Sequence, residues 1–106
     1  MTAGAYSKTS LARAEAARTM ILHWPEAEGR VVTAQDFVEI ARKDAGWRRT
    51  LTMWCPPRRG EELPSTRSVG RALAAVRGVA IEGYVIEVVK RTKQGALWAR
   101  LVVSTP

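Results

Sequence analysis

Residues 65–78 read STRSVGRALAAVRG, and this stretch decides the predicted fold. Its apolar side chains recur at the i, i+3, i+4, i+7 spacing that places them on one face of a helix: Val69, Ala72, Leu73 and Val76. Ser65 or Thr66 can cap the first turn, and Gly78 suits the left-handed residue that ends many helices. The stretch therefore predicts an amphipathic helix whose apolar face is buried.

The other side of this predicted helix carries arginine and small residues: Thr66, Arg67, Ser68, Gly70, Arg71 and Ala74. Such a surface can lie close to a phosphate backbone and reach the edges of bases. It is also what an ordinary solvated helix face looks like in a basic protein. We interpret it as a recognition helix in which Arg67, Ser68 and Arg71 contact DNA bases.

The charge of the chain is concentrated in its later part. The chain has 106 residues and a formal net charge of +7, with 46% hydrophobic and 25% charged residues, as in ordinary globular proteins. Residues 1–41 hold four basic and five acidic residues, whereas residues 42–106 hold thirteen basic and five acidic ones. We expect one domain over residues 1–106, with residues 1–8 disordered, and a polyanionic partner for the basic part.

Two further helices are predicted before the basic stretch. Residues 8–24 form the first, which Pro25 ends. Its stripe at helical spacing consists of Leu11, Ala14, Ala17 or Arg18, Ile21 and Trp24. Residues 31–33 suit a short extended segment. Thr33 and Asp36, three residues apart, resemble a capping box at the start of the second helix. Gly46 ends or loosens this helix, and a further helical turn or two follows up to Trp54.

Residues 55–64 form the clearest predicted loop, because three prolines and a glycine interrupt regular structure there. Arg58 and Arg59 in this loop are either phosphate contacts or simply solvated.

After the basic helix, residues 81–89 and 97–103 are rich in β-branched residues and predict a two-stranded hairpin. Both faces of the strands carry apolar side chains, so the register stays open. The turn between them, residues 90–95, holds Lys90, Arg91 and Lys93. A basic hairpin directly after a basic helix is typical of a wing that follows a DNA groove or its phosphates.

The predicted order is that of an α+β winged helix-turn-helix, with a three-helix core and a C-terminal two-stranded wing. The basic and polar side chains at its surface are expected to contact DNA phosphates: Thr66, Arg58, Arg59, Lys90, Arg91, Lys93 and Arg100.

Four short segments support the same fold: TAQDF at 33–37, WC at 54–55, LPSTRSVGRAL at 63–73 and RTKQGALW at 91–98. Together they resemble the C-terminal winged-helix domain of phage and plasmid primase-helicases, over roughly residues 33–102. The resemblance implies engagement of nucleic acid. It implies no catalysis, because no primase or helicase motor motif is present.

Enzymatic and metal-binding signatures are weak in this sequence. It has one histidine, His23, one cysteine, Cys55, and no glycine-rich phosphate loop, so we expect no enzyme activity, no metal and no cofactor. Cys55 is expected to pack in the core of a cytoplasmic protein. Trp24, Trp47 and Trp54 are expected in the core as well, while Trp98 is either a core residue or a stacking platform for bases.

The favoured function is binding of double-stranded DNA in transcription or replication control, without a membrane, and a protein partner or a homodimer stays open. The alternative is a protein-interaction module, such as a phage-encoded inhibitor of a host nucleic-acid-binding complex, because fold does not fix function. Binding of RNA or single strands is a third hypothesis.

Overall fold

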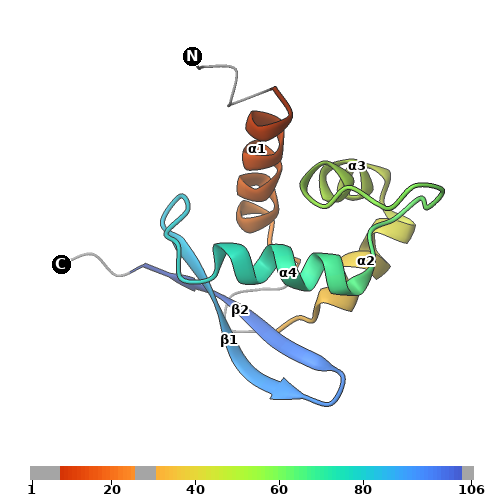
Figure 1. Cartoon of the computed structure of the whole chain (residues 1–106). Coiled ribbons are helices and arrows are strands. Elements are labelled where there is room, and N and C mark those ends of the chain that lie inside the picture. The colour runs from red at the N-terminus through yellow and green to blue at the C-terminus, as the bar shows by residue number, and fades with distance from the viewer. Residues whose placement is uncertain (1–7, 26–30, 104–106) are drawn as a thin grey trace.

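The computed structural model describes residues 8–25 and 31–103, with the backbone alone for residues 8–10. Its elements are α1 (Lys8–Leu22), α2 (Ala34–Lys43), α3 (Ala45–Trp54), α4 (Thr66–Val76), β1 (Tyr84–Thr92) and β2 (Gly95–Val102). The described chain is therefore α+β, with four helices and a two-stranded antiparallel hairpin. Figure 1 shows how these elements are arranged. The predicted class is confirmed, and the arrangement is compatible with a winged helix. The disorder expected for residues 1–8 concerns positions outside the described residues, except that Lys8 begins α1.

Helix α1 begins where predicted but ends at Leu22, two residues earlier than predicted, and it buries a different face. Leu11 is 61% exposed and Ala14 is exposed as well, so the predicted stripe was wrong in its first half. Trp24, two residues past the end of α1, is buried, and the residues that α1 itself buries are Ala16, Ala17, Met20 and Ile21. They belong to the second half of the helix, and α1 packs on α3. Small alanines on this face let the two helices approach closely.

The predicted second helix is in fact two helices, separated at Asp44. The backbone N–H of Asp44 donates to the Ile40 carbonyl at 2.9 Å, which closes α2, and its carboxylate accepts from the Trp47 N–H at 2.9 Å, which opens α3. Asp44 has extended backbone angles, and Gly46 lies inside α3. The break predicted at Gly46 thus lies two residues earlier, because a carboxylate cap starts a new helix there. At the start of α2, the capping box of Thr33 and Asp36 is confirmed.

Helix α4 forms as the sequence predicts. The Ser65 hydroxyl accepts from the Ser68 N–H at 3.1 Å, and Gly78 follows the helix with a φ of +75°. Val69 and Leu73 are fully buried, and Ala72 and Val76 are half-buried. Helix α4 packs on α2 and leads into β1, where the Gly78 N–H donates to the Ile86 carbonyl.

The hairpin extends further than the sequence predicts. Strand β1 continues to Thr92 and β2 starts at Gly95, so Lys90 and Arg91 lie in a strand and only two residues remain in the turn. The register shifts between Val88 and Lys90, which is a β-bulge. On the other edge of β2, Val32 and Trp98 exchange two backbone hydrogen bonds of 2.8 and 2.7 Å. The extended segment predicted at residues 31–33 therefore lies beside the hairpin.

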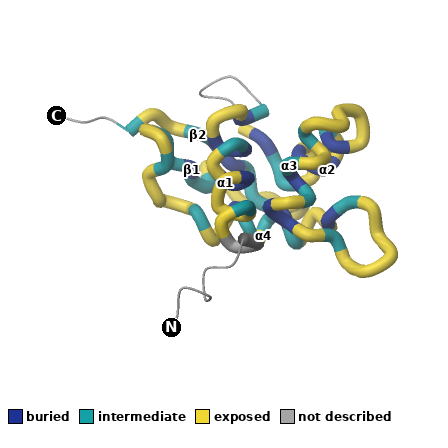
Figure 2. The backbone as a smooth tube through the Cα atoms, turned by 90° about the horizontal axis from the view of Figure 1, so that it is seen from above, coloured by how far each residue is buried: buried dark blue, intermediate teal, exposed yellow. Residues whose placement is uncertain are grey.

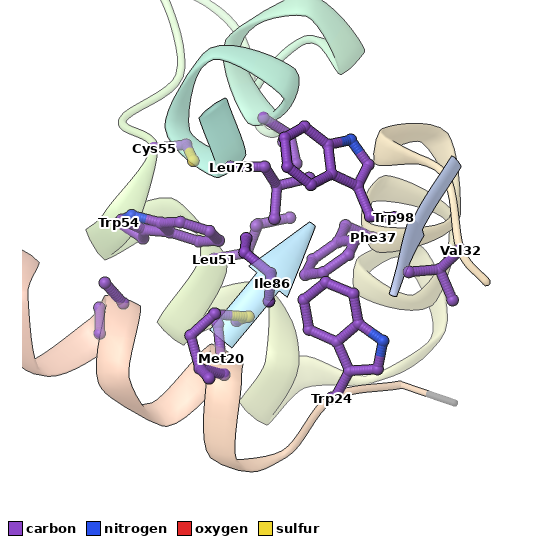
Figure 3. Packing of buried hydrophobic residues seen from close by; sticks show 14 of the residues in the cluster. Met20, Trp24, Val32, Phe37, Leu51, Trp54, Cys55, Leu73, Ile86 and Trp98 are labelled. Atoms are coloured by element: carbon purple, nitrogen blue, oxygen red, sulfur yellow. The ribbon is translucent and has the colours of Figure 1, made fainter. Parts of the chain in front are cut away.

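Phe37 lies at the centre of the core (Figure 3). Its ring centroid is 5.3 Å from that of Trp24, 5.5 Å from Trp47 and 6.5 Å from Trp54. Trp98 is only 4% exposed and belongs to the same cluster, so the structure places it in the core. Figure 2 shows buried residues gathered toward the middle of the molecule and exposed ones along the outside of the helices and the hairpin. None of the described helices has the length and apolarity to cross a membrane.

Candidate nucleic-acid interface

A groove of about 400 Å³ lies between the start of α2, one side of α4 from Thr66 to Ala74 and the turn end of the hairpin. Arg67 and Arg71 reach it from α4, and Arg91 reaches it from β1. Polar side chains without charge also line it: Thr33, Gln35, Thr66 and Gln94. No aspartate or glutamate is among the described residues that line this groove. The groove is thus a concave surface whose charged side chains are all cations.

The three arginines of the groove are available to a ligand. All three are exposed, and none forms an ion pair or a side-chain hydrogen bond with another residue in the part of the chain that the structure describes. A guanidinium without a carboxylate partner keeps its full field and its five donors for phosphates or for the acceptors on guanine.

The β-bulge determines which cation of β1 enters the groove. Val88 is opposite Trp98, but after the bulge Lys90 is opposite Leu97 and Arg91 is opposite Ala96. Directly opposed residues share a face of the sheet, and neighbours along a strand point to opposite faces. Without the extra residue, Lys90 would be opposite Ala96. The bulge therefore directs Arg91 toward α4 and Lys90 to the other face of the hairpin.

The remaining surface of the groove is apolar and is formed by small residues around one indole: Ala34, Gly70, Ala74, Ala96 and Trp98. They come from α2, α4 and β2, so three elements that are distant in sequence meet there. Helix α2 presents its first turn, where Thr33 is the cap residue. Cations, neutral polar groups and apolar carbon thus line the same groove.

Several residues predicted to contact DNA lie outside the groove. Ser68 is half-buried, and its hydroxyl is 3.1 Å from that of Ser65, with which it forms a hydrogen bond within the cap of α4. Lys93 is exposed in the hairpin turn next to Gln94. Arg58 lines a separate shallow pocket together with Glu61 and Arg67, and Arg59 is exposed in the loop.

Arg100 differs most from its predicted role. Its guanidinium donates to the carbonyls of Ile21 and Leu22 at 3.0 and 2.9 Å and lies 4.1 Å from the centre of the Tyr84 ring. A cation at the last carbonyls of a helix satisfies acceptors that have no partner within the helix. Arg100 therefore connects β2 to the end of α1, and we do not retain it as a phosphate contact.

Cys55 and His23 add no second site. Burial raises the pKa of the Cys55 thiol to about 11, although the charge of Arg13 acts against this shift. The thiol is therefore protonated and poorly nucleophilic at neutral pH. His23 is exposed, and the described residues contain no group of three or more His, Cys, Asp or Glu side chains arranged to hold a metal ion.

Comparisons with protein-family models, with curated proteins and with solved structures found no match for this chain.

Sequence reasoning included Thr66 but missed the two glutamines of the groove, Gln35 and Gln94. Gln94 adjoins the basic run of the hairpin, which is a signal that could have identified it. Gln35 carries no such signal, because only the packing of α2 on α4 brings it to this surface.

Proposed function

We propose that this chain is a winged-helix protein that binds double-stranded DNA through the groove between α4 and the hairpin. The observation that supports this most directly is the convergence of Arg67, Arg71 and Arg91, from two elements, on one surface with no carboxylate among its described lining residues. In this proposal α1, α2 with α3, and α4 form the helical core, and β1 and β2 form the wing.

Helix α4 is the element that enters the major groove of DNA in this proposal. The major groove is about 12 Å wide and admits one helix. Arg67 and Arg71 lie one turn apart on the exposed side of α4, so both can face base edges, where arginine pairs best with guanine. Thr66, Arg91 and Lys93 contact phosphates, because they lie at the start of the helix and at the turn end of the hairpin.

The test compares Arg71→Ala with Lys93→Ala. A preferred duplex is first selected from a random pool with the wild-type protein, and affinities for it and for random duplex are measured by fluorescence anisotropy at several salt concentrations. Arg71→Ala is expected to lose about 1–3 kcal/mol on the selected duplex and less on random duplex. Lys93→Ala is expected to weaken both duplexes alike and to lower the salt slope by about 1.

Two outcomes would contradict the proposal. One is absence of duplex binding by the wild-type protein at low salt, and the other is equal behaviour of the two variants on both duplexes. Single-stranded DNA and RNA of the same sequence serve as competitors. If no nucleic acid binds, a protein partner with an acidic surface becomes the better hypothesis for the same groove.

A further inference from the structure

Gly70 lies in the middle of α4, where its own helix gives no reason for glycine. A glycine inside a helix is less favourable than alanine, because it loses more backbone freedom on folding. Gly70 is not among the residues with positive φ. A Cβ atom built there would meet only the Cβ of Ala34, at 3.9 Å, which is an ordinary van der Waals distance. Neither backbone conformation nor packing among the described residues therefore requires glycine at this position.

Because Gly70 has no side chain, the groove is deeper at this position. It lines the groove together with Ala74, one turn further along α4, and with Ala34 and Ala96 from the two facing elements. Arg67 precedes Gly70 by one turn, and Arg71 follows it directly. A ligand that approaches between these cations meets bare backbone at Gly70, where any other residue would present a side chain.

The chemistry around Gly70 suits the sugar–phosphate backbone of DNA. Such a chain alternates a charged phosphate with a deoxyribose whose ring carbons are apolar. The groove offers both kinds of surface, with Arg91 from the hairpin, Arg71 from α4 and small apolar residues in the same lining. A base edge would leave the apolar surface uncovered and would offer Arg91 no charge.

We propose that Gly70 is the point where the backbone of one DNA strand lies against α4. A deoxyribose packs on Gly70 and Ala74, while the adjoining phosphate binds Arg91. Gly70 then sets how closely the strand approaches the helix and so whether Arg71 reaches the bases. This inference rests on the proposed function and specifies which part of the DNA occupies the groove.

The experiment measures thermal stability and duplex affinity of Gly70→Ala, with Gly46→Ala as the matched control. Gly46 is the other described glycine within a helix, and it lies in α3, outside the groove. Gly70→Ala is expected to raise the melting temperature by about 4 °C, since alanine favours the helix. It is nevertheless expected to weaken duplex binding about five- to tenfold, because the added methyl group occupies space that the strand needs. Gly46→Ala is expected to leave affinity unchanged.

A second pair of variants separates an effect on DNA binding from an effect on folding. Ala74→Leu fills the groove from the next turn of α4, whereas Ala75→Leu places the same side chain on an exposed position that does not line it. Ala74→Leu is expected to weaken binding at least as much as Gly70→Ala, and Ala75→Leu to have no effect. The inference is overturned if the wild-type protein binds duplex and Arg91→Ala lowers its affinity, while Gly70→Ala and Ala74→Leu both bind duplex with wild-type affinity. Absence of wild-type binding would instead overturn the proposed function and this inference together.

Discussion

The basic residues near the two ends of the hairpin differ in whether they have partners within the protein. Near Tyr84, the arginines are engaged within the protein: Arg18 contacts Glu15 and Glu82 at 2.8 Å, Arg77 contacts Glu87 at 3.0 Å, and Arg100 binds the end of α1. Near the turn from Thr92 to Gly95, the cations form no ion pair with any carboxylate of the described residues: Arg67, Arg71, Arg91 and Lys93.

This difference shows that the number of basic residues matters less than which of them have partners. The hydrogen bonds to Glu82 and Glu15 raise the pKa of Arg18, and the two carboxylates place negative charge directly beside its positive charge. Paired charges contribute little to the field that a ligand meets, whereas unpaired ones that share a concave surface reinforce one another. The positive field is therefore expected to be strongest over the groove at the turn end.

The largest effect should come from reversing charge at the turn end. In the double variant Arg71→Glu and Arg91→Glu, two contacts become repulsions inside the groove, and duplex affinity is expected to fall by at least about a hundredfold. The matched control is Arg48→Glu with Arg49→Glu, which changes the net charge equally on exposed positions of α3. The control is expected to lose at most about tenfold, through the long-range field alone. Anisotropy titrations at one fixed salt concentration provide the measurement, and equal losses in both variants would mean that net charge, and no particular surface, governs binding.

A smaller effect, on stability, is expected at the Tyr84 end. Arg100→Met retains much of the length of the side chain but removes its two hydrogen bonds to the last carbonyls of α1. The free energy of unfolding is expected to fall by about 2–3 kcal/mol, the range for hydrogen bonds made by a charged group. Urea denaturation checks this, with the exposed loop variant Arg58→Met as the control. A normal stability combined with weaker duplex binding would restore Arg100 to the interface and remove the contrast between the two ends.

The sequence predicts those features of the fold that local chemistry determines. The helix 66–76, its serine cap, its buried Val69 and Leu73 and its glycine end were all predictable, because periodicity and capping act within a few residues. The break at Asp44 was missed, since glycine is the more familiar helix terminator and a carboxylate cap between two helices resembles an ordinary helix end.

The candidate site was predictable in the residues that α4 contributes, including the uncharged Thr66, Gly70 and Ala74. Arg67 and Arg71 follow from the helix pattern, but the choice of Arg91 over Lys90 depends on a bulge that alternation of side chains does not reveal. The engagement of Arg100 depends on the end of α1, which is nearly eighty residues away in sequence. Tertiary contacts of this kind decide which basic residues remain free, and no local pattern encodes them.

The smallest predicted effect concerns the ion pair of Arg77 and Glu87, which joins the end of α4 to β1. Both side chains are nearly half exposed, at 49% and 40%, so water screens their attraction. A double-mutant cycle with Arg77→Ala and Glu87→Ala is expected to give a coupling of roughly 0.2–1 kcal/mol that decreases in high salt. Urea denaturation at two salt concentrations measures it, and duplex affinity should stay unchanged in all three variants. A severalfold stronger duplex binding of Glu87→Ala would mean that Arg77 contacts DNA once its partner is removed. The DNA-binding surface would then extend along the hairpin toward Tyr84, beyond the cations of the turn end.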